Sequence, residues 1–370
     1  MNEEQGRHST WVTIDLDAIK NNVRYFLDRN SVQVMAIVKA NAYGHGAVPV
    51  AQAALEAGAT WCGVARTNEA LELRQAGIEC PILLLGYTPE AWYEEMIHHQ
   101  ISMTVWDTKQ IENISGVASK INSKAKLHLK VDTGMSRLGA DPKEVIRMLH
   151  GIAAFPNIQI EGLFTHFARA DETDSKPTDA QEEQFHGLLA KLKEASIQIP
   201  LVHAANSAAS LTRPSVYFNC VRVGIAMYGL HPSPERPLPA VFRSVLAWKS
   251  VLSQVKLLPP GRGISYGHEY VTSREERIGT IPVGYADGFR RVPGNQVLVG
   301  GRKVPVLGRV TMDQIMVQLD AVPEANAGDE VVLLGVQGEQ SITAEEIADR
   351  WGTINYEVTS GIAHRVPRIY

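Results

Sequence analysis

The chain has 370 residues, of which 45% are apolar and 21% charged, with a formal net charge of −4, and this length predicts a large domain and a smaller one. The small net charge argues against nucleic acid or an anionic membrane as the main partner. The polar first eight residues, the absence of a long uncharged run and three scattered cysteines (Cys62, Cys80 and Cys220) predict a cytoplasmic chain with buried thiols and no signal peptide or membrane span.

Short apolar runs alternate with amphipathic segments from about residue 32 to residue 230, after a strand-like run at 11–14 and a helix that begins near Asp17. The apolar runs, which we predict to be strands, lie at 34–38, 61–65, 82–85, 101–105, 127–131, 160–164, 200–204 and 221–225. Helices are predicted at 47–57, 67–76, 89–98, 142–154 and 179–195. Eight such units predict an α/β fold, a (β/α)8 TIM-type barrel, whose active site is built at the C-terminal ends of the strands.

The pattern changes after about Pro239, where β-branched residues alternate or cluster between glycine-rich turns. Strands are predicted at 251–257, 277–281, 296–299 and 330–334, and a helix at 344–351 follows a capping signal at 341–343. We therefore expect a barrel domain at residues 10–238 and a mostly β domain at residues 239–370, with the N-terminal residues 1–14 as a candidate addition to the second domain.

Lys39 directly follows the apolar run 34–38 and precedes Tyr43, Gly44 and Gly46. A lysine at the end of a buried strand is partly desolvated, which lowers its pKa and makes the neutral amine available as a nucleophile or base. Pyridoxal 5'-phosphate (PLP) chemistry needs such an amine. The structural alternative is a lysine whose ammonium group simply reaches solvent.

A second group of polar residues lies toward the end of the predicted barrel. Arg222 interrupts an apolar strand and requires a partner, either in a structural ion pair or as part of a site where Gly224 and Ile225 present backbone N–H groups to a phosphate. Asn206 and Ser207 follow the preceding strand, where such residues are usually helix caps. A cap can also bind phosphate when its helix faces the cavity.

Further candidate residues follow strand ends or lie in turns. Arg137 could hold a carboxylate, with a surface arginine as the alternative, and His166 could equally be a core histidine bound to a carbonyl. The triplet at 132–134 is also found in aspartic proteases, but it occurs once and without their double-sheet frame. Tyr266 and Asp313 lie in segments that could be plain turns. No metal or nucleotide motif is present, so no metal site is predicted.

Taken together, seven segments in this order resemble the alanine racemases, the barrel-type family of PLP-dependent amino acid racemases. They are 36–46, 132–139, 165–168, 221–225, 264–267, 284–288 and 308–313. The resemblance runs from near Trp11 to the C-terminus. Ser136 and Phe289 depart from what many members carry, which leaves the substrate range open.

The resemblance implies a role for each matching residue. Lys39 would bind PLP covalently and act as base on one face of the substrate Cα, and Tyr266 of the partner subunit would be the base on the opposite face of a composite site in a homodimer. Cofactor-binding residues would be Tyr43, Leu85, His166, Asn206, Ser207, Arg222, Gly224, Ile225 and Tyr356. Arg222 would meet the pyridine nitrogen, and His166 would link Arg222 to Tyr266. The remaining roles would be substrate binding by Arg137 and Met312, a carbamate on Lys130, catalysis with Asp313, and an entry channel of Asp171, Tyr285 and Arg309.

The implied activity is interconversion of L- and D-alanine, which would supply D-alanine for peptidoglycan. An arginine stays protonated and leaves the ring nitrogen unprotonated, so the ring is a weaker electron sink than it would be beside a carboxylate. Arg222 therefore favours a racemase over a barrel-type PLP decarboxylase. The sequence also leaves open a serine or broader-range racemase, a non-catalytic PLP-binding barrel and a barrel without cofactor.

Overall fold

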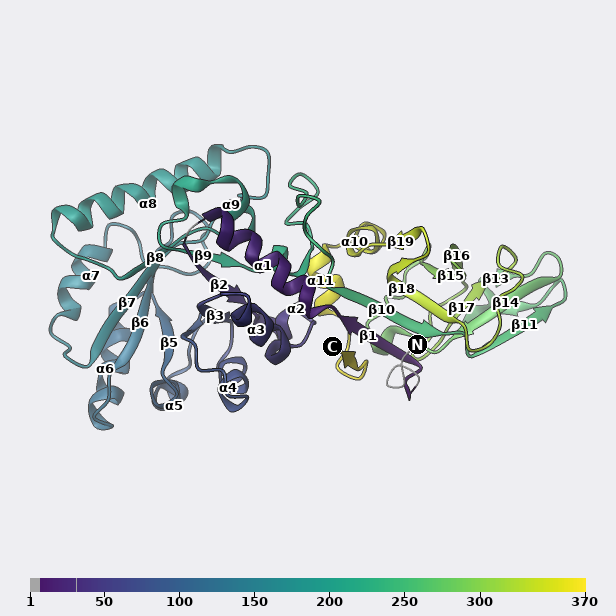
Figure 1. The fold of residues 1–370 in the computed structure, drawn as a ribbon. Helices are drawn as coiled ribbons and strands as arrows, with labels where there is room; N and C mark the ends of the chain where they lie inside the picture. Colours follow the sequence, from purple (N-terminus) through teal and green to yellow (C-terminus); the bar gives the residue numbers. More distant parts are fainter. Residues whose placement is uncertain (1–6, 31) are drawn as a thin grey trace. The chain divides into compact units, whose positions relative to one another are not determined.

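The structure is a computed structural model that describes residues 7–30 and 32–370. The chain forms two units, and Figure 1 labels the elements of both. One unit comprises Asp17–Ala42 and Gly46–Arg243. The other comprises the chain up to Leu16, Tyr43–His45 and Ser244–Tyr370. In the described part of the chain, no helix is long and apolar enough to cross a membrane.

Eight parallel strands form the centre of the first unit. In sheet order they are β8 (Leu201–His203), β7 (Ile158–Phe164), β6 (Ala125–Lys130), β5 (Ile101–Val105), β4 (Ile82–Leu84), β3 (Trp61–Val64), β2 (Gln33–Ile37) and β9 (Cys220–Val223). The backbone N–H of Arg222 donates to the carbonyl of Ala205 over 2.9 Å, which links the two ends of this order. All eight predicted strands are present, and the predicted (β/α)8 barrel is confirmed.

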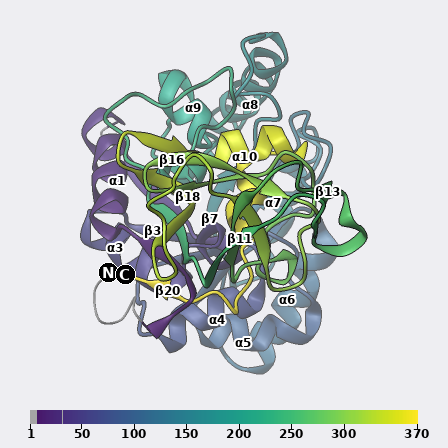
Figure 2. The same cartoon turned by 90° about the vertical axis from the view of Figure 1, so that its right-hand side faces the viewer.

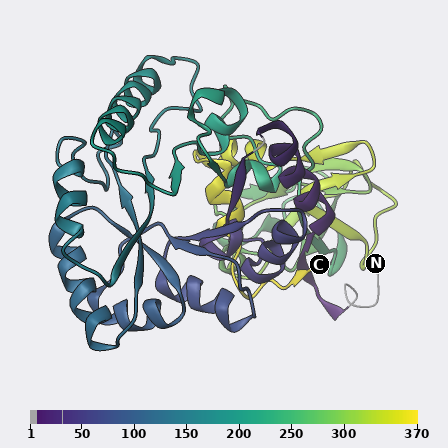
Figure 3. The same ribbon diagram turned by 60° about the vertical axis from the view of Figure 1, so that its left-hand side comes forward.

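Helices surround these strands, as the blue and teal part of Figure 3 shows. They are α1 (Leu16–Asn30), α2 (Lys39–Tyr43), α3 (Ala47–Glu56), α4 (Thr67–Gln75), α5 (Tyr93–His98), α6 (Thr108–Lys120), α7 (Val145–Ile152), α8 (Lys176–Glu194) and α9 (Ser207–Thr212), with short 3-10 helices η2 (Glu90–Trp92), η3 (Pro214–Val216) and η4 (Ile225–Tyr228). α6 has no counterpart among the predicted helices, although Asp107 caps it by accepting a hydrogen bond from the N–H of Gln110 over 2.8 Å.

The interior of the barrel is polar as well as apolar. Apolar side chains such as Met35 and Ile82 are fully buried, as expected for parallel strands covered on both faces. Lys130, His203 and Arg222 are buried among them. Buried charged and polar groups need hydrogen-bond partners, so this layer marks the part of the barrel to inspect for a site.

A sheet forms the second unit, and Figure 2 shows its strands β11, β16 and β18. The order is β11 (Gln254–Leu258), β14 (Glu276–Ile281), β17 (Ile315–Gln318), β16 (Arg302–Leu307), β15 (Gln296–Val299), β18 (Glu330–Gln337), β10 (Leu246–Val251), β1 (Thr10–Ile14) and β20 (Arg368–Ile369), with β19 (Gln340–Ile342) beside β18 and a hairpin of β12 (Gly263–Ile264) and β13 (Tyr270–Val271). The helical segments are η5 (Tyr266–His268), η6 (Tyr285–Asp287), α10 (Ala344–Trp351) and α11 (Asn355–Ser360). A mostly β second unit is therefore confirmed.

Several predictions about local structure can be compared with the second unit. β1 pairs antiparallel with β10, as the candidate addition of residues 1–14 anticipates, while residues 1–6 lie outside the described residues. α10 has the predicted bounds, and the hydroxyl of Thr343 caps it by accepting from Glu346 N–H. The predicted strand at 251–257 is confirmed for 254–257, which lie in β11, and is wrong at its start, because Val251 ends β10 and β11 begins at Gln254.

The three cysteines are free thiols, all in the first unit. Cys62 and Cys220 are buried. Cys80 is only partly buried, so the prediction of a buried thiol is wrong there, since it stands just before β4 at the edge of the barrel.

Candidate active site

Lys39 begins a turn with an unusual backbone. Ala40, Asn41, Ala42 and Tyr43 all have φ values of 52–54°, in the left-handed region. Each such residue costs about 1–2 kcal/mol relative to a right-handed turn, so the surrounding structure must hold it. The N–H of Ala42 donates to Val38 O over 2.8 Å, and the side-chain oxygen of Asn41 accepts from Ala47 N–H over 2.8 Å. The turn therefore fixes the backbone of Lys39 directly after β2.

Glu69 ties this turn to the neighbouring strand. One carboxylate oxygen accepts from Ala40 N–H over 2.6 Å, and the other accepts from the N–H groups of Ala65 and Arg66 over 2.7 and 3.1 Å. Glu69 is the third residue of α4, a position where a carboxylate commonly reaches back to free N–H groups. Sequence reasoning missed Glu69, although this helix position is a usable signal.

Lys39 lies in a positive environment. Burial, and next the charge of Arg137, lower the pKa of Lys39, while Glu69 acts in the opposite direction and Arg222 adds to the lowering. Burial, then Arg137 and Arg222, also lower the pKa of Lys130 to about 8. The structure thus brings four basic side chains, Lys39, Lys130, Arg137 and Arg222, within electrostatic reach of one another, which favours an anionic ligand.

Arg222 is held by neutral acceptors. Nη1 contacts Nδ1 of His203 at 2.9 Å, and Nη2 contacts Nδ1 of His166 at 3.0 Å. Nη2 also donates to the carbonyls of Thr165 and Ala204, each over 2.9 Å. Of the residues that the structure describes, no carboxylate forms an ion pair with Arg222, so the alternative of a structural ion pair is wrong.

The Nε–H of Arg222 has no partner in the described protein. Within residues 7–30 and 32–370, Nε makes no hydrogen bond, although the residue is only 3% exposed. Its guanidinium also lies 5.4 Å from the centre of the Phe164 ring, which adds a cation–π contact. An N–H donor without a protein partner, on a residue this deeply buried, is suited to a ligand atom that accepts a hydrogen bond.

His166 adopts a role that differs from that of a core histidine bound to a carbonyl. Burial, and next the charge of Arg222, hold the pKa of His166 well below its usual value. Its own carbonyl accepts from the side chain of Gln181 over 3.1 Å. His166 therefore stays neutral and is bound on one side to Arg222.

Ser207, Gly224 and Ile225 lie together at the end of the barrel strands. The hydroxyl of Ser207 accepts from the N–H of Gly224 over 3.0 Å and from that of Ala226 over 3.3 Å, and Ile225 begins η4. Converging N–H groups and a hydroxyl are suited to phosphate. The side chain of Asn206 instead caps α9, accepting from Ala209 N–H over 3.0 Å.

Two further predicted residues lie in loops of the barrel unit. Leu85 follows β4 and donates its N–H to Val64 O over 2.8 Å. Asp171 lies between β7 and α8, where its carbonyl accepts from the hydroxyl of Ser233 over 2.5 Å. Burial raises the pKa of the Asp171 carboxyl group.

The second unit brings three of the predicted residues together on two adjoining loops. The N–H of Tyr285 donates to Thr311 O over 3.0 Å, and that of Ala286 donates to Met312 O over 3.1 Å. Tyr285 and Met312 have exposed side chains. Asp313 follows Met312, is also exposed, and accepts from Arg365 over 2.7 Å. Tyr285, Met312 and Asp313 therefore lie together on the exposed surface of these two loops.

Tyr266, which is exposed, and Arg309, which is partly buried, lie on neighbouring segments of the second unit. Tyr266 is 70% exposed. The preceding residue, Ser265, donates its hydroxyl to Arg309 O over 2.6 Å, and the guanidinium of Arg309 pairs with Glu269 at 2.5 Å. Most of the surface of Tyr266 is therefore open in the described chain.

Tyr43 and Tyr356 also meet in this unit, with ring centres 6.0 Å apart. Burial raises the pKa of Tyr43 well above its usual value, so its hydroxyl stays protonated and can donate. Tyr356 lies on α11, a helix that sequence reasoning did not predict.

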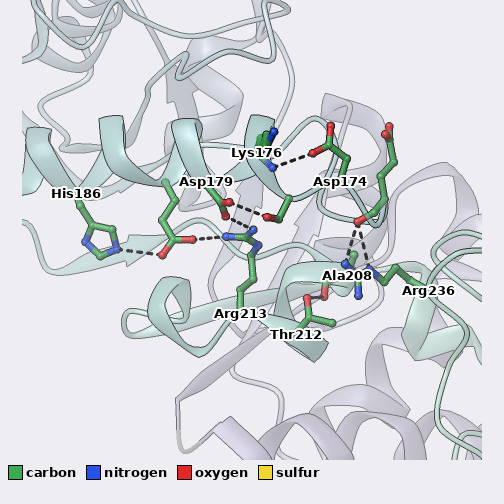
Figure 4. Close-up of polar contacts among 11 residues, drawn as sticks. Asp174, Lys176, Asp179, His186, Ala208, Thr212, Arg213 and Arg236 are labelled. Atoms are coloured by element: carbon green, nitrogen blue, oxygen red, sulfur yellow. Dashed lines mark hydrogen bonds and ion pairs between the residues drawn. The ribbon is translucent and has the colours of Figure 1, made fainter.

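A separate polar cluster lies between α8 and the segment after α9 and is drawn in Figure 4. Arg213 donates to Asp179 and, over 2.7 Å, to Glu182, while Nε2 of His186 lies 3.7 Å from Glu182. Because an arginine occupies these carboxylates, we interpret the cluster as an ion-pair network that holds α8 in place.

Comparisons with known proteins bear on the whole chain. The family model described as alanine racemase, N-terminal domain, matches residues 14–232, and the model described as alanine racemase, C-terminal domain, matches residues 245–370. An alanine racemase of Halothermothrix orenii is 44% identical, over 98% of this chain and 96% of the relative. One from Halalkalibacterium halodurans is 46% identical, over 98% of this chain and 95% of the relative.

Solved structures give the same result. The alanine racemase of Clostridium difficile 630 matches with a TM-score of 0.93 and 41% identity, covering 98% of this chain and 96% of that chain. The enzyme from Bacillus anthracis, solved with bound L-Ala-P, matches with a TM-score of 0.92 and 43% identity, covering 98% and 95%. The family and fold predicted from the sequence are confirmed. The chain therefore belongs to the alanine racemase family and is an amino acid racemase.

Proposed function

We propose that the chain interconverts L- and D-alanine with PLP as cofactor, using Lys39 and Tyr266 of the partner subunit as bases on opposite faces of the substrate. The observation that carries the proposal is the buried guanidinium of Arg222, with its unpaired Nε and neutral partners, beside the partly desolvated amine of Lys39. Membership of the alanine racemase family supports alanine as the substrate.

The residues of the chain fit PLP. Lys39 would bind it, Arg222 Nε would donate to the ring nitrogen, and Ser207 with the N–H groups after β9 would hold the phosphate. The hydroxyls of Tyr43 and Tyr356, together with Leu85 and Asn206, are further proposed contacts. When bound, PLP supplies a conjugated ring that stabilises the negative charge left on Cα once its proton is removed.

Racemisation needs proton removal on one face of Cα and proton return on the other. Lys39 supplies one base, because its lowered pKa increases the fraction of neutral amine near neutral pH. Tyr266 supplies the other, and its 70% exposure in one chain supports delivery into the site of a second copy. We therefore propose a homodimer with composite sites.

Substrate orientation is the proposed role of the remaining groups. Arg137 and the backbone at Met312 would bind the carboxylate of alanine, and Lys130 would become a carbamate that pairs with Arg137. Asp313 is proposed to act with them. Asp171, Tyr285 and Arg309 would line the entry channel, and the product D-alanine would serve peptidoglycan synthesis.

Hydrogen exchange at Cα tests this proposal. In deuterated water, the purified enzyme should exchange the α-hydrogen of both L- and D-alanine and interconvert them, as followed by NMR and chiral chromatography. Lys39→Ala should abolish the exchange and the absorbance of lysine-bound PLP, whereas Lys126→Ala, on barrel strand β6, should change neither. Pyruvate or an amine as the main product would contradict the proposal. A panel including serine would reveal a broader racemase.

Mixing subunits tests the composite site. A dimer of one Lys39→Ala subunit and one Tyr266→Phe subunit contains one site in which both bases are intact. Activity in the mixed sample, absent from either parent, is expected if Tyr266 acts across the interface. No recovery, with dimers confirmed by light scattering, would place both bases in one subunit.

A further inference from the structure

Two buried histidines and a glutamate lie in line behind Arg222 inside the barrel. Nδ1 of His203 faces Nη1 of Arg222 at 2.9 Å, and Nε2 of His203 faces Nδ1 of His128 at 3.0 Å. Nε2 of His128 lies 3.4 Å from Oε2 of Glu161, an electrostatic contact that is longer than the other two and is not a hydrogen bond in this structure. Ser102 donates its hydroxyl to the same carboxylate oxygen over 2.5 Å.

Elementary donor and acceptor rules fix every proton in this series. Arginine only donates, so Nδ1 of His203 must accept, and the single proton of the neutral ring is on Nε2. That N–H donates to His128 Nδ1, which leaves the proton of His128 on its Nε2, directed at Glu161. Protonating either ring would place two donors face to face. Both histidines are therefore neutral and carry their proton on Nε2.

The surroundings of the two rings support this assignment. Both histidines are 0% exposed, and the groups facing them are Arg222, Glu161 and each other. Burial, and next Arg222, hold the pKa of His203 well below its usual value. The Phe164 ring stacks on His203 with centres 4.7 Å apart. Neither ring can easily rotate or gain a proton.

The local structure of β7 provides the space for this arrangement. Its register with β6 shifts between Leu127 and His128, so Glu161 is an extra residue on β7, a bulge of the kind that redirects a side chain. Gly162 follows, and a Cβ there would lie 2.2 Å from Nδ1 of His128. A bulge and a glycine together make room for one imidazole and direct one carboxylate toward it.

We propose that Glu161, His128 and His203 are positioning residues, which hold the guanidinium of Arg222 through two successive hydrogen bonds, from Arg222 to His203 and from His203 to His128, and an electrostatic contact from His128 to Glu161. The series ends on a carboxylate whose side chain is 17% exposed. It orients Arg222 and provides a distant negative charge, while no carboxylate among the described residues stands close enough to compete for Nε. Hydrogen bonds in such a series also polarise and strengthen one another.

Histidine NMR of the wild-type enzyme tests the proton assignment, and substituted enzymes serve only to assign the signals. The experiment uses full-length enzyme with cofactor and 15N-labelled histidine, with signals assigned by single replacement of His128 and His203. Both rings are expected to show a proton on Nε2 and no titration around pH ~6.5, where a free imidazole titrates. A proton on Nδ1, or an imidazolium signal from either ring, would overturn the proposal.

A matched pair of variants tests the effect on Arg222. His203→Gln keeps an acceptor for Arg222 and a donor for His128, while His203→Leu keeps neither. In His203→Leu we expect a changed absorption spectrum of the bound cofactor and a kcat lower by about ten- to a hundred-fold, with a smaller change in KM, since a hydrogen bond to a charged group contributes such a factor. His203→Gln should recover most of the loss. His150→Leu, an exposed site on α7, is the control.

Wild-type kinetics and spectrum in His203→Leu, or equal losses in both His203 variants, would overturn the positioning role. The effect on kinetics rests on the proposed function, because Arg222 is there the partner of the ring nitrogen. The NMR result does not rest on the proposed function, so a failure of the positioning proposal can be distinguished from a failure of the proposed function.

Discussion

Nη2 of Arg222 lies 3.0 Å from Nδ1 of His166. Because arginine donates only, Nδ1 of His166 accepts, and the proton of this neutral ring is on Nε2. His166 therefore has a donor left on the side away from Arg222. A phenolate needs such a donor, and this supports the proposed link between Arg222 and the base Tyr266.

We predict that Tyr266→Phe impairs the two directions of the reaction unequally. Removing one base of a pair costs about 10²–10⁴-fold where that base acts, so exchange of the α-hydrogen should fall steeply for one enantiomer of alanine and less for the other. NMR of each enantiomer in deuterated water measures this. Tyr87→Phe, another exposed tyrosine, should behave as wild type. Equal and slight losses would contradict the role of Tyr266.

We predict that Glu69→Gln loosens the turn at Lys39. A glutamine has one carbonyl oxygen and cannot serve both Ala40 and Ala65, so the enzyme should lose about 1–2 kcal/mol of unfolding free energy. Glu69 raises the pKa of Lys39, so that pKa should fall further in the variant. Urea unfolding measures the first effect, and the pH dependence of Lys39 labelling by an amine reagent measures the second. Glu72→Gln, exposed on the same helix, is the control, and equal results for both would reject this role.

The barrel could be predicted because each strand is a short apolar run and most of these runs are followed by a helix with its own periodicity. Those signals are local, and they reach the correct end of each strand, as at Lys39. The left-handed turn from Ala40 to Tyr43 could not be predicted, since four non-glycine residues there oppose their own preference and depend on Glu69 from another element.

The candidate site was predictable in its residues more than in its contacts. A buried arginine such as Arg222 needs hydrogen-bond partners, and this could be predicted. Which partners it has could not: they are His203, His166 and the carbonyls of Thr165 and Ala204. Nothing local to Arg222 indicates that these acceptors are neutral. The distances between strands across the barrel determine which acceptors reach Arg222, and the sequence does not contain those distances.

We predict that Lys130 takes up carbon dioxide. With its pKa lowered to about 8, a substantial fraction of the amine is neutral near neutral pH, unlike an ordinary lysine, and only the neutral amine forms a carbamate. The carbamate would also replace a cation beside Arg137 and Arg222 by an anion. Labelled bicarbonate should give a carbamate NMR signal that Lys130→Met abolishes and Lys126→Met retains. An unchanged signal in Lys130→Met would refute the assignment.

The same lysine gives a pH dependence of stability with a definite sign. The pKa of Lys130 is lower in the folded enzyme, about 8, than its ordinary 10.5, so between these values the unfolded chain binds more protons. Stability should therefore rise with pH in this window, by up to about 1.4 kcal/mol per pH unit from one proton. Unfolding by urea in buffer free of carbon dioxide should show a steeper rise for wild type than for Lys130→Met. Parallel curves would contradict it.

We predict that Gly284→Ala disturbs the loop that carries Met312. A Cβ at this position would lie 2.2 Å from Met312 O and 2.3 Å from Thr311 O, closer than real contacts allow. The loop must move, at a cost of about 1–3 kcal/mol in unfolding free energy.

Because this movement breaks the hydrogen bonds that the N–H groups of Tyr285 and Ala286 donate to the loop, the backbone at Met312 shifts, and KM for alanine should rise more than kcat falls. Gly151→Ala, where a Cβ meets nothing within 4 Å, should keep wild-type kinetics and gain up to about 1 kcal/mol from helix propensity. An unchanged KM in a clearly destabilised Gly284→Ala enzyme would show that this loop does not bind the substrate carboxylate.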